Sequence, residues 1–117
     1  MDPILVVEDD ERVLEAITEF LAMVGYSVDA AHNGEEAIDH ARASHPSLIL
    51  LDLSMPVMDG WEFLRRRSTE PSIANVPIVV ISALASGAPE GAEGFLTKPI
   101  DVDKLLAVLS RYCGAPA

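Results

Sequence analysis

Apolar residues along this chain follow two alternating patterns. Short runs such as residues 48–51 (Leu-Ile-Leu-Leu) carry no polar side chain, which is typical of strands buried on both faces of a parallel sheet. Between the runs, apolar residues recur every three or four positions, as on one face of an α-helix. Strands are predicted over Ile4–Val7, Ser27–Ala31, Leu48–Leu51, Ile78–Ile81 and Gly94–Thr97.

The first helical segment shows the second pattern most clearly. Apolar residues recur at helical spacing over this segment, and Gly25 supplies a stop; the residues are Val13, Ile17, Phe20, Leu21 and Val24. Asp10, just before this stripe, suits a helix N-cap as well as it suits a site residue, and the pattern leaves both roles open. The predicted helices begin near Asp10, Asn33, Trp61 and Asp101, and they end near Gly25, His45-Pro46, Arg65-Arg66-Arg67 and Gly114.

The order of these elements predicts the fold class. Strands alternate with helical segments, as in α/β proteins with a parallel sheet and helices on both faces. Right-handed crossovers then leave very few topologies. Residues 83–94 depart from the alternation, because three glycines and a proline in this segment oppose any long helix.

Composition indicates a single domain. The 117 residues suffice for one buried core, so we predict one domain over residues 1–117, with 113–117 as a frayed tail or the start of a linker. The net charge of −11 argues against direct binding of nucleic acid or an anionic membrane. The lone Cys113 fits a reducing compartment, and no apolar stretch approaches the ~20 residues that span a bilayer. We therefore expect a cytoplasmic domain.

Side chains suited to phosphoryl chemistry follow the predicted strands. Glu8 and Asp9 come directly after the first strand, Asp52 after the third, Ser82 after the fourth and Lys98 after the fifth. The carboxyl ends of parallel strands meet at one edge of a sheet, where open α/β sheets bind ligands. Clustered carboxylates repel one another unless a hard cation such as Mg²⁺ lies among them. A lysine and a hydroxyl beside a nucleophilic carboxylate complete the set needed for phosphoryl transfer onto Asp52.

Four motifs in this order resemble the receiver domain of two-component response regulators. They are Val6–Asp10, Leu51–Gly60, Ile81–Ala83 and Gly94–Pro99, and the resemblance covers nearly the whole chain. It implies Asp52 as phosphoacceptor, Asp9 as direct Mg²⁺ ligand, Glu8 as a ligand through water, the Ser54 backbone carbonyl as a further ligand, Ser82 as switch hydroxyl, Lys98 as phosphate-binding lysine and Phe95 as the aromatic switch residue.

The same resemblance implies a doubly wound, flavodoxin-like fold with five parallel strands in the order 2-1-3-4-5 and a cis bond between Lys98 and Pro99. A histidine kinase or phosphotransfer protein would phosphorylate Asp52, and a downstream effector protein or effector domain would bind the changed surface. The family usually has a full helix between strands four and five. Here only residues 83–94 separate Ser82 from Phe95, so we predict a shortened or missing fourth helix. That puts the usual form of the output and dimerisation face in doubt and leaves a homodimer open.

Two other functions remain open from the sequence. A Mg²⁺-dependent aspartyl phosphatase would usually carry a second acid two residues after its nucleophile, where this chain has Ser54. A degenerate receiver would bind its partner regardless of phosphorylation. The three histidines lack the spacing of a zinc site and are predicted to be surface residues, and Arg65-Arg66-Arg67 is predicted to be a solvated helix face.

Overall fold

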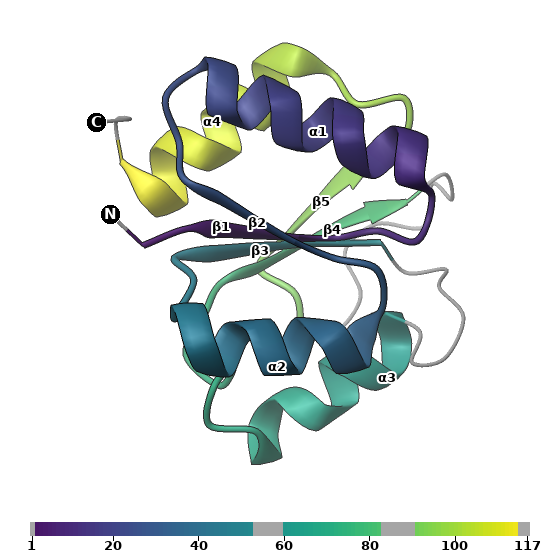
Figure 1. Ribbon diagram of the computed structural model, residues 1–117, viewed down its shortest axis with the longest axis vertical. Helices are drawn as coiled ribbons and strands as arrows, with labels where there is room; N and C mark the ends of the chain where they lie inside the picture. Colours follow the sequence, from purple (N-terminus) through teal and green to yellow (C-terminus); the bar gives the residue numbers. More distant parts are fainter. Residues whose placement is uncertain (1, 53–59, 83–90, 115–117) are drawn as a thin grey trace.

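A five-stranded parallel sheet lies between two layers of helices in this computed structural model, which describes residues 2–52, 60–82 and 91–114 (Figure 1). The strand order is β2-β1-β3-β4-β5, as predicted. Helices α1 and α4 cover one face of the sheet, and α2 and α3 cover the other. The elements are β1 (Ile4–Val7), α1 (Glu11–Met23), β2 (Val28–Ala31), α2 (Gly34–Ser44), β3 (Leu48–Asp52), α3 (Gly60–Arg66), the 3₁₀ turn η1 (Arg67–Thr69), β4 (Ile78–Ser82), β5 (Gly94–Thr97) and α4 (Val102–Cys113).

The central strands β1, β3 and β4 are apolar, apart from Asp52 and Ser82 at the ends of β3 and β4, because they pack against both helical layers. Successive side chains of a strand point to opposite faces. Leu5 and Val7 of β1 therefore join the core under α2 and α3, whereas Ile4 and Val6 join the core under α1 and α4. All four side chains are almost completely buried. This two-sided burial fixes β1 and its neighbour β3, and so fixes the residues at which these strands end.

Side-chain caps define the helix starts. Asp10 accepts hydrogen bonds from the backbone amides of Arg12 at 2.9 Å and Val13 at 3.4 Å, which assigns it the N-cap role in α1. Asn33 caps α2 in the same way, through the amide of Glu36 at 2.9 Å. Such caps contribute about 1 kcal/mol each, because they satisfy amides that the helix leaves without partners.

The predicted apolar stripe of α1 is confirmed in part, because Ile17 and Leu21 are buried as expected, whereas Leu14 was not predicted. Leu14, Ile17 and Leu21 are the buried residues of the helix. Val13 and Phe20, which also belong to the predicted stripe, pack against the same core but are only half-buried. Either set satisfies a period of three to four residues, so helical spacing alone does not identify the residues nearest the sheet.

Arg67 is the exception to the predicted solvated arginine face. Its guanidinium forms an ion pair with Glu93 at 2.6 Å and donates hydrogen bonds to the carbonyls of Val76 and Gly91. Glu93 in turn accepts from the amide of Ile78 at 2.8 Å. These contacts join η1 to the starts of β4 and β5. Arg67 therefore has a structural role, whereas Arg65 and Arg66 are exposed as predicted.

Two predictions fall on residues outside the described ranges. The shortened or missing fourth helix would lie in 83–90, so its form stays a prediction, and the described residues 91–93 contain no helix. Ser54 also lies outside the described residues. The predicted cis bond between Lys98 and Pro99 is confirmed. Within the described ranges, every helix is too short or too polar to cross a bilayer.

Candidate functional site

Three carboxylates converge where β1 and β3 end. Val7, the last residue of β1, pairs with Leu51 of β3, so Glu8 directly after β1 lies beside Asp52 at the end of β3. One carboxylate oxygen from each of Glu8, Asp9 and Asp52 lies within 4.8 Å of the other two. Glu8 and Asp52 are buried, while Asp9 is exposed. The predicted clustering of acids at this edge is therefore observed.

Lys98 adds a cation to the same edge. Its Nζ lies 2.9 Å from Oε1 of Glu8 and 3.5 Å from Oδ2 of Asp52. Its position is set by the backbone, because the Lys98 amide donates to the carbonyl of Ser82 at 2.9 Å, where β4 ends. The pairing with Asp52 was predicted, but the shorter contact with Glu8 was not. Both acids lie one residue past a buried run, so the sequence carries no signal that distinguishes them.

The acids in this cluster disfavour one another's ionisation. Burial raises the pKa of Glu8, and a hydrogen bond shared with Asp52 raises it further, against the opposing effect of Lys98. Burial and the neighbouring Glu8 likewise raise the pKa of Asp9. Although burial alone would lower the pKa of Lys98, the contacts with Glu8 and Asp52 outweigh it and raise that pKa.

This donor set fits a hard divalent cation. Mg²⁺ prefers carboxylate and carbonyl oxygens, keeps several of its waters and is bound through one or two protein carboxylates. A bound cation would favour the ionised forms of Glu8 and Asp9, whose pKa values are raised by burial and by the neighbouring carboxyl groups. The exposed Asp9 leaves the cluster open on its solvent side.

The two predicted switch residues lie on the neighbouring strands. Ser82 ends β4 and is buried, and its predecessor Ile81 pairs with Asp52 across the sheet. Phe95 lies on the edge strand β5, where it pairs with Val80. The Phe95 side chain is half-buried against the core under α2 and α3. Phe95 thus lies in the first half of β5, whereas the other predicted site residues that the structure describes lie at or just past the carboxyl ends of the strands.

An apolar groove beside the acids was not predicted. It lies between α1 and the segment from Lys98 to the first turn of α4, with a volume of about 680 Å³. Val13 and Phe20 line it, which explains why these α1 residues are half-buried instead of fully buried. The sequence carried no signal for this groove, because its pattern placed Val13 and Phe20 on the same stripe as the buried residues. The other apolar residues of the wall are Ala16, Ile17, Pro99, Ile100, Val102 and Leu105.

Known proteins resemble this chain in sequence and architecture. The sequence profile of the response regulator receiver domain matches residues 4–110. Response regulator MprA of Mycobacterium avium is 40% identical over 111 residues, which cover 89% of this chain and 47% of MprA. The polar-differentiation response regulator DivK of Brucella ovis is 28% identical over 117 residues, and the alignment covers 95% of this chain and 95% of DivK.

Solved structures agree. The chemotaxis protein CheY4 of Vibrio cholerae superimposes with a TM-score of 0.85 at 30% identity, covering 96% of this chain and 98% of CheY4. This chain spans about half the length of the MprA relatives that it matches. The profile match extends over nearly all of the sheet and its helices, including the strand ends where the acids and Lys98 converge. The chain therefore belongs to the response regulator receiver domain family of two-component systems.

Proposed function

We propose that this domain is a phosphorylation-controlled switch in which Asp52 accepts a phosphoryl group from a histidine kinase or phosphotransfer protein. The observation that carries the proposal is the convergence of Glu8, Asp9 and Asp52 beside Lys98. A carboxylate nucleophile beside acids that need a cation, and a lysine able to pair with phosphoryl oxygens, are the groups that this transfer requires.

The chemistry follows from these positions. A carboxylate oxygen of Asp52 forms a bond to phosphorus as the bond from phosphorus to the donor breaks, and the bonding electrons leave with the donor. Lys98 is near enough to Asp52 to pair with an oxygen of the transferred group. A bound Mg²⁺ would supply charge neutralisation for the acids and the phosphoryl oxygens. Hydrolysis of the acyl phosphate by water restores Asp52.

The readout of phosphorylation is assigned to Ser82 and Phe95. The buried hydroxyl of Ser82 would turn toward the new phosphoryl oxygens, and Phe95 would move further into the core from its half-buried position. Such a change shifts a two-state equilibrium that a downstream effector protein or domain detects.

The apolar groove supports a protein donor. A donor histidine has to reach Asp52, and the groove lined by Val13 and Phe20 shares Lys98 with the acid cluster. An apolar helix face seated there would hold its histidine near the site. The groove therefore favours a helical kinase or phosphotransfer partner over free small donors as the main source of phosphoryl groups.

The proposal is tested with acetyl phosphate as the donor and the intact mass of the protein as the readout. We expect a phosphate adduct when Mg²⁺ is present and none when the cation is removed by chelation, because the acids then repel the incoming phosphoryl group. A stoichiometric adduct that Mg²⁺ does not affect would contradict the proposal. Complete absence of an adduct would favour the degenerate receiver, and rapid turnover of a generic phosphate ester would favour the phosphatase.

A further inference from the structure

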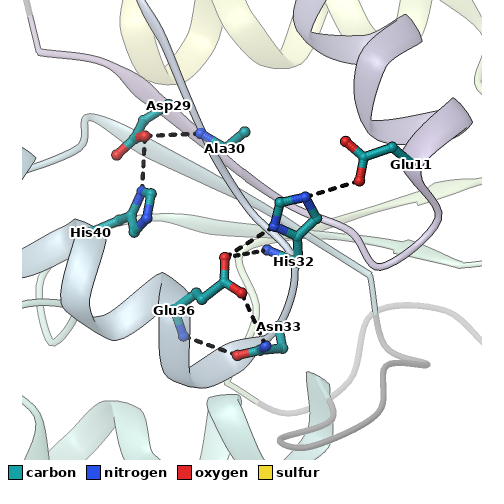
Figure 2. A network of polar contacts seen from close by, with 7 residues as sticks. All are labelled: Glu11, Asp29, Ala30, His32, Asn33, Glu36 and His40. Carbon is teal, nitrogen blue, oxygen red and sulfur yellow. Dashed lines mark hydrogen bonds and ion pairs between the residues drawn. The ribbon is translucent and has the colours of Figure 1, made fainter.

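His32 connects two helices through carboxylates on opposite sides of its ring. It directly follows β2, with Nε2 3.0 Å from Oε2 of Glu11 on α1 and Nδ1 3.0 Å from Oε1 of Glu36 on α2. Figure 2 shows the ring between these two side chains. The backbone amide of His32 also donates to Glu36, at 3.2 Å. The residue therefore joins the starts of α1 and α2 at the carboxyl edge of the sheet.

Both ring contacts require the protonated form of His32. Ionised carboxylates only accept hydrogen bonds, so each ring nitrogen has to carry a proton, and only the imidazolium does so. Consistent with this, the hydrogen bond to Glu36 and the charge of Glu11 raise the pKa of His32. The pKa of Glu36 is lowered by His32, with a smaller contribution from His40 on α2, and Asn33 donates to the second oxygen of Glu36 at 3.3 Å.

The contact with Glu11 fixes one end of the turn that carries Asp9. Glu8 holds the end of this turn that is nearer to β1. Its Oε2 accepts a hydrogen bond from the backbone amide of Asp10 at 3.2 Å, and its Oε1 contacts Lys98. The exposed Asp9 lies between these two attachments and follows the backbone of the turn. Loss of the attachment at Glu11 would remove the link from the start of α1 to His32 and α2 and leave that start held by the Asp10 cap and by helix packing.

We propose that His32 is a positioning residue for the metal-binding turn, where its ion pair with Glu11 holds the start of α1, and Asp9 with it, in the orientation that a divalent cation requires. The inference rests on the proposed Mg²⁺ site and concerns a residue outside the site itself. His32 acts through Glu11, because no contact of the described structure joins it to Asp9 directly.

The chain offers a matched control in His40. Its Nδ1 lies 2.9 Å from Oδ1 of Asp29, so it forms a histidine–carboxylate pair of similar length, with a carboxylate that is less exposed than Glu11. That pair joins α2 to the edge strand β2 and leaves α1 untouched (Figure 2). A general effect of salt or cation on surface histidines would act on His40 as well as on His32.

The test follows the ring protons of both histidines by NMR through a pH titration, with and without saturating Mg²⁺, at near-physiological salt. If protonated His32 holds Asp9 in place through Glu11, protonation of His32 and binding of Mg²⁺ favour each other. We therefore expect Mg²⁺ to bind ~2- to 5-fold more tightly when His32 is protonated. By reciprocity, Mg²⁺ should raise the pKa of His32 and leave that of His40 unchanged. Direct repulsion between the cation and the imidazolium would lower the pKa of His32, so the two effects differ in sign.

The variant Glu11→Gln removes the partner on α1 and keeps the helix start. In this variant we expect Mg²⁺ no longer to raise the pKa of His32. The inference alone is overturned if the Asp9 and Asp52 resonances respond to Mg²⁺ while the pKa of His32 falls or stays constant, or if the rise persists in Glu11→Gln. If Asp9 and Asp52 do not respond to Mg²⁺, the proposed metal site fails and this inference fails with it.

Discussion

Replacing Asp52 with asparagine is expected to lower the rate of phosphoryl labelling by acetyl phosphate at least ~10³-fold, because the neutral amide lacks a nucleophilic carboxylate oxygen. The side chain keeps its shape, and it ends a strand that is buried along its whole length. Intact-mass measurement over time in the presence of Mg²⁺ gives the rate. Labelling of Asp52→Asn at the parent rate would show that another residue accepts the phosphoryl group.

The matched control is Asp39→Asn on α2. The Asp39 side chain is 76% exposed, and its pair with Arg42 is long at 3.7 Å, so this variant should label like the parent protein. Asp52→Asn should also remain folded. Its carboxylate contributes to the raised pKa of Glu8, so the change lowers the free-energy cost of ionising Glu8 in the folded state. A urea midpoint well below that of the parent at neutral pH would mean that misfolding causes the loss of labelling.

Replacing Lys98 with alanine is expected to lower the labelling rate by ~10²- to 10³-fold, a typical loss when one preorganised charge is removed from a developing anion. Lys98 contacts two carboxylates whose side chains are only 3% and 8% exposed, Glu8 and Asp52. Without it, the buried pair has no lysine to balance its charge and the incoming phosphoryl group loses a cationic partner. A rate within about threefold of the parent would contradict this role.

Lys104→Ala is the matched control, because Lys104 is the only other lysine and is exposed on α4. The two variants should also differ in stability. Lys98 is one of the contacts that lower the pKa of Glu8, so Lys98→Ala raises that pKa further above its unfolded value. An acid whose folded pKa is raised costs stability once pH exceeds the unfolded pKa. The urea midpoint of Lys98→Ala should therefore fall relative to the parent at neutral pH and approach it on acidification, whereas Lys104→Ala should match the parent throughout.

The parts of the fold that follow from local chemistry could be predicted from the sequence. Continuous apolar runs located the buried strands, because a strand covered on both faces needs no polar position. The acids at the strand ends then had to meet, since parallel strands end at one edge of the sheet. The convergence of Glu8, Asp9 and Asp52 could therefore be predicted from their positions directly after the predicted strands.

Other features depend on contacts between distant segments, and no local pattern encodes them. Arg67 belongs to an arginine run that suggested a solvated face, but the chain that follows folds back and brings Glu93 within 2.6 Å of it. His32 lacks the spacing of a metal site, and only the packing of α1 beside β2 places Glu11 against its ring. The groove arises from the rotation of α1, which helical period alone does not determine.

The convergence of acids that traps a divalent ion beside Asp52 is tested most directly by locating the ion. Paramagnetic Mn²⁺, added well below one equivalent, broadens the NMR signals of the nuclei nearest to it. We expect the amide signals of Glu8, Asp9 and Asp52 to broaden first and excess Mg²⁺ to restore them. Strongest broadening at the exposed acids of α2, such as Glu35 and Asp39, with Asp9 and Asp52 unaffected, would contradict this expectation.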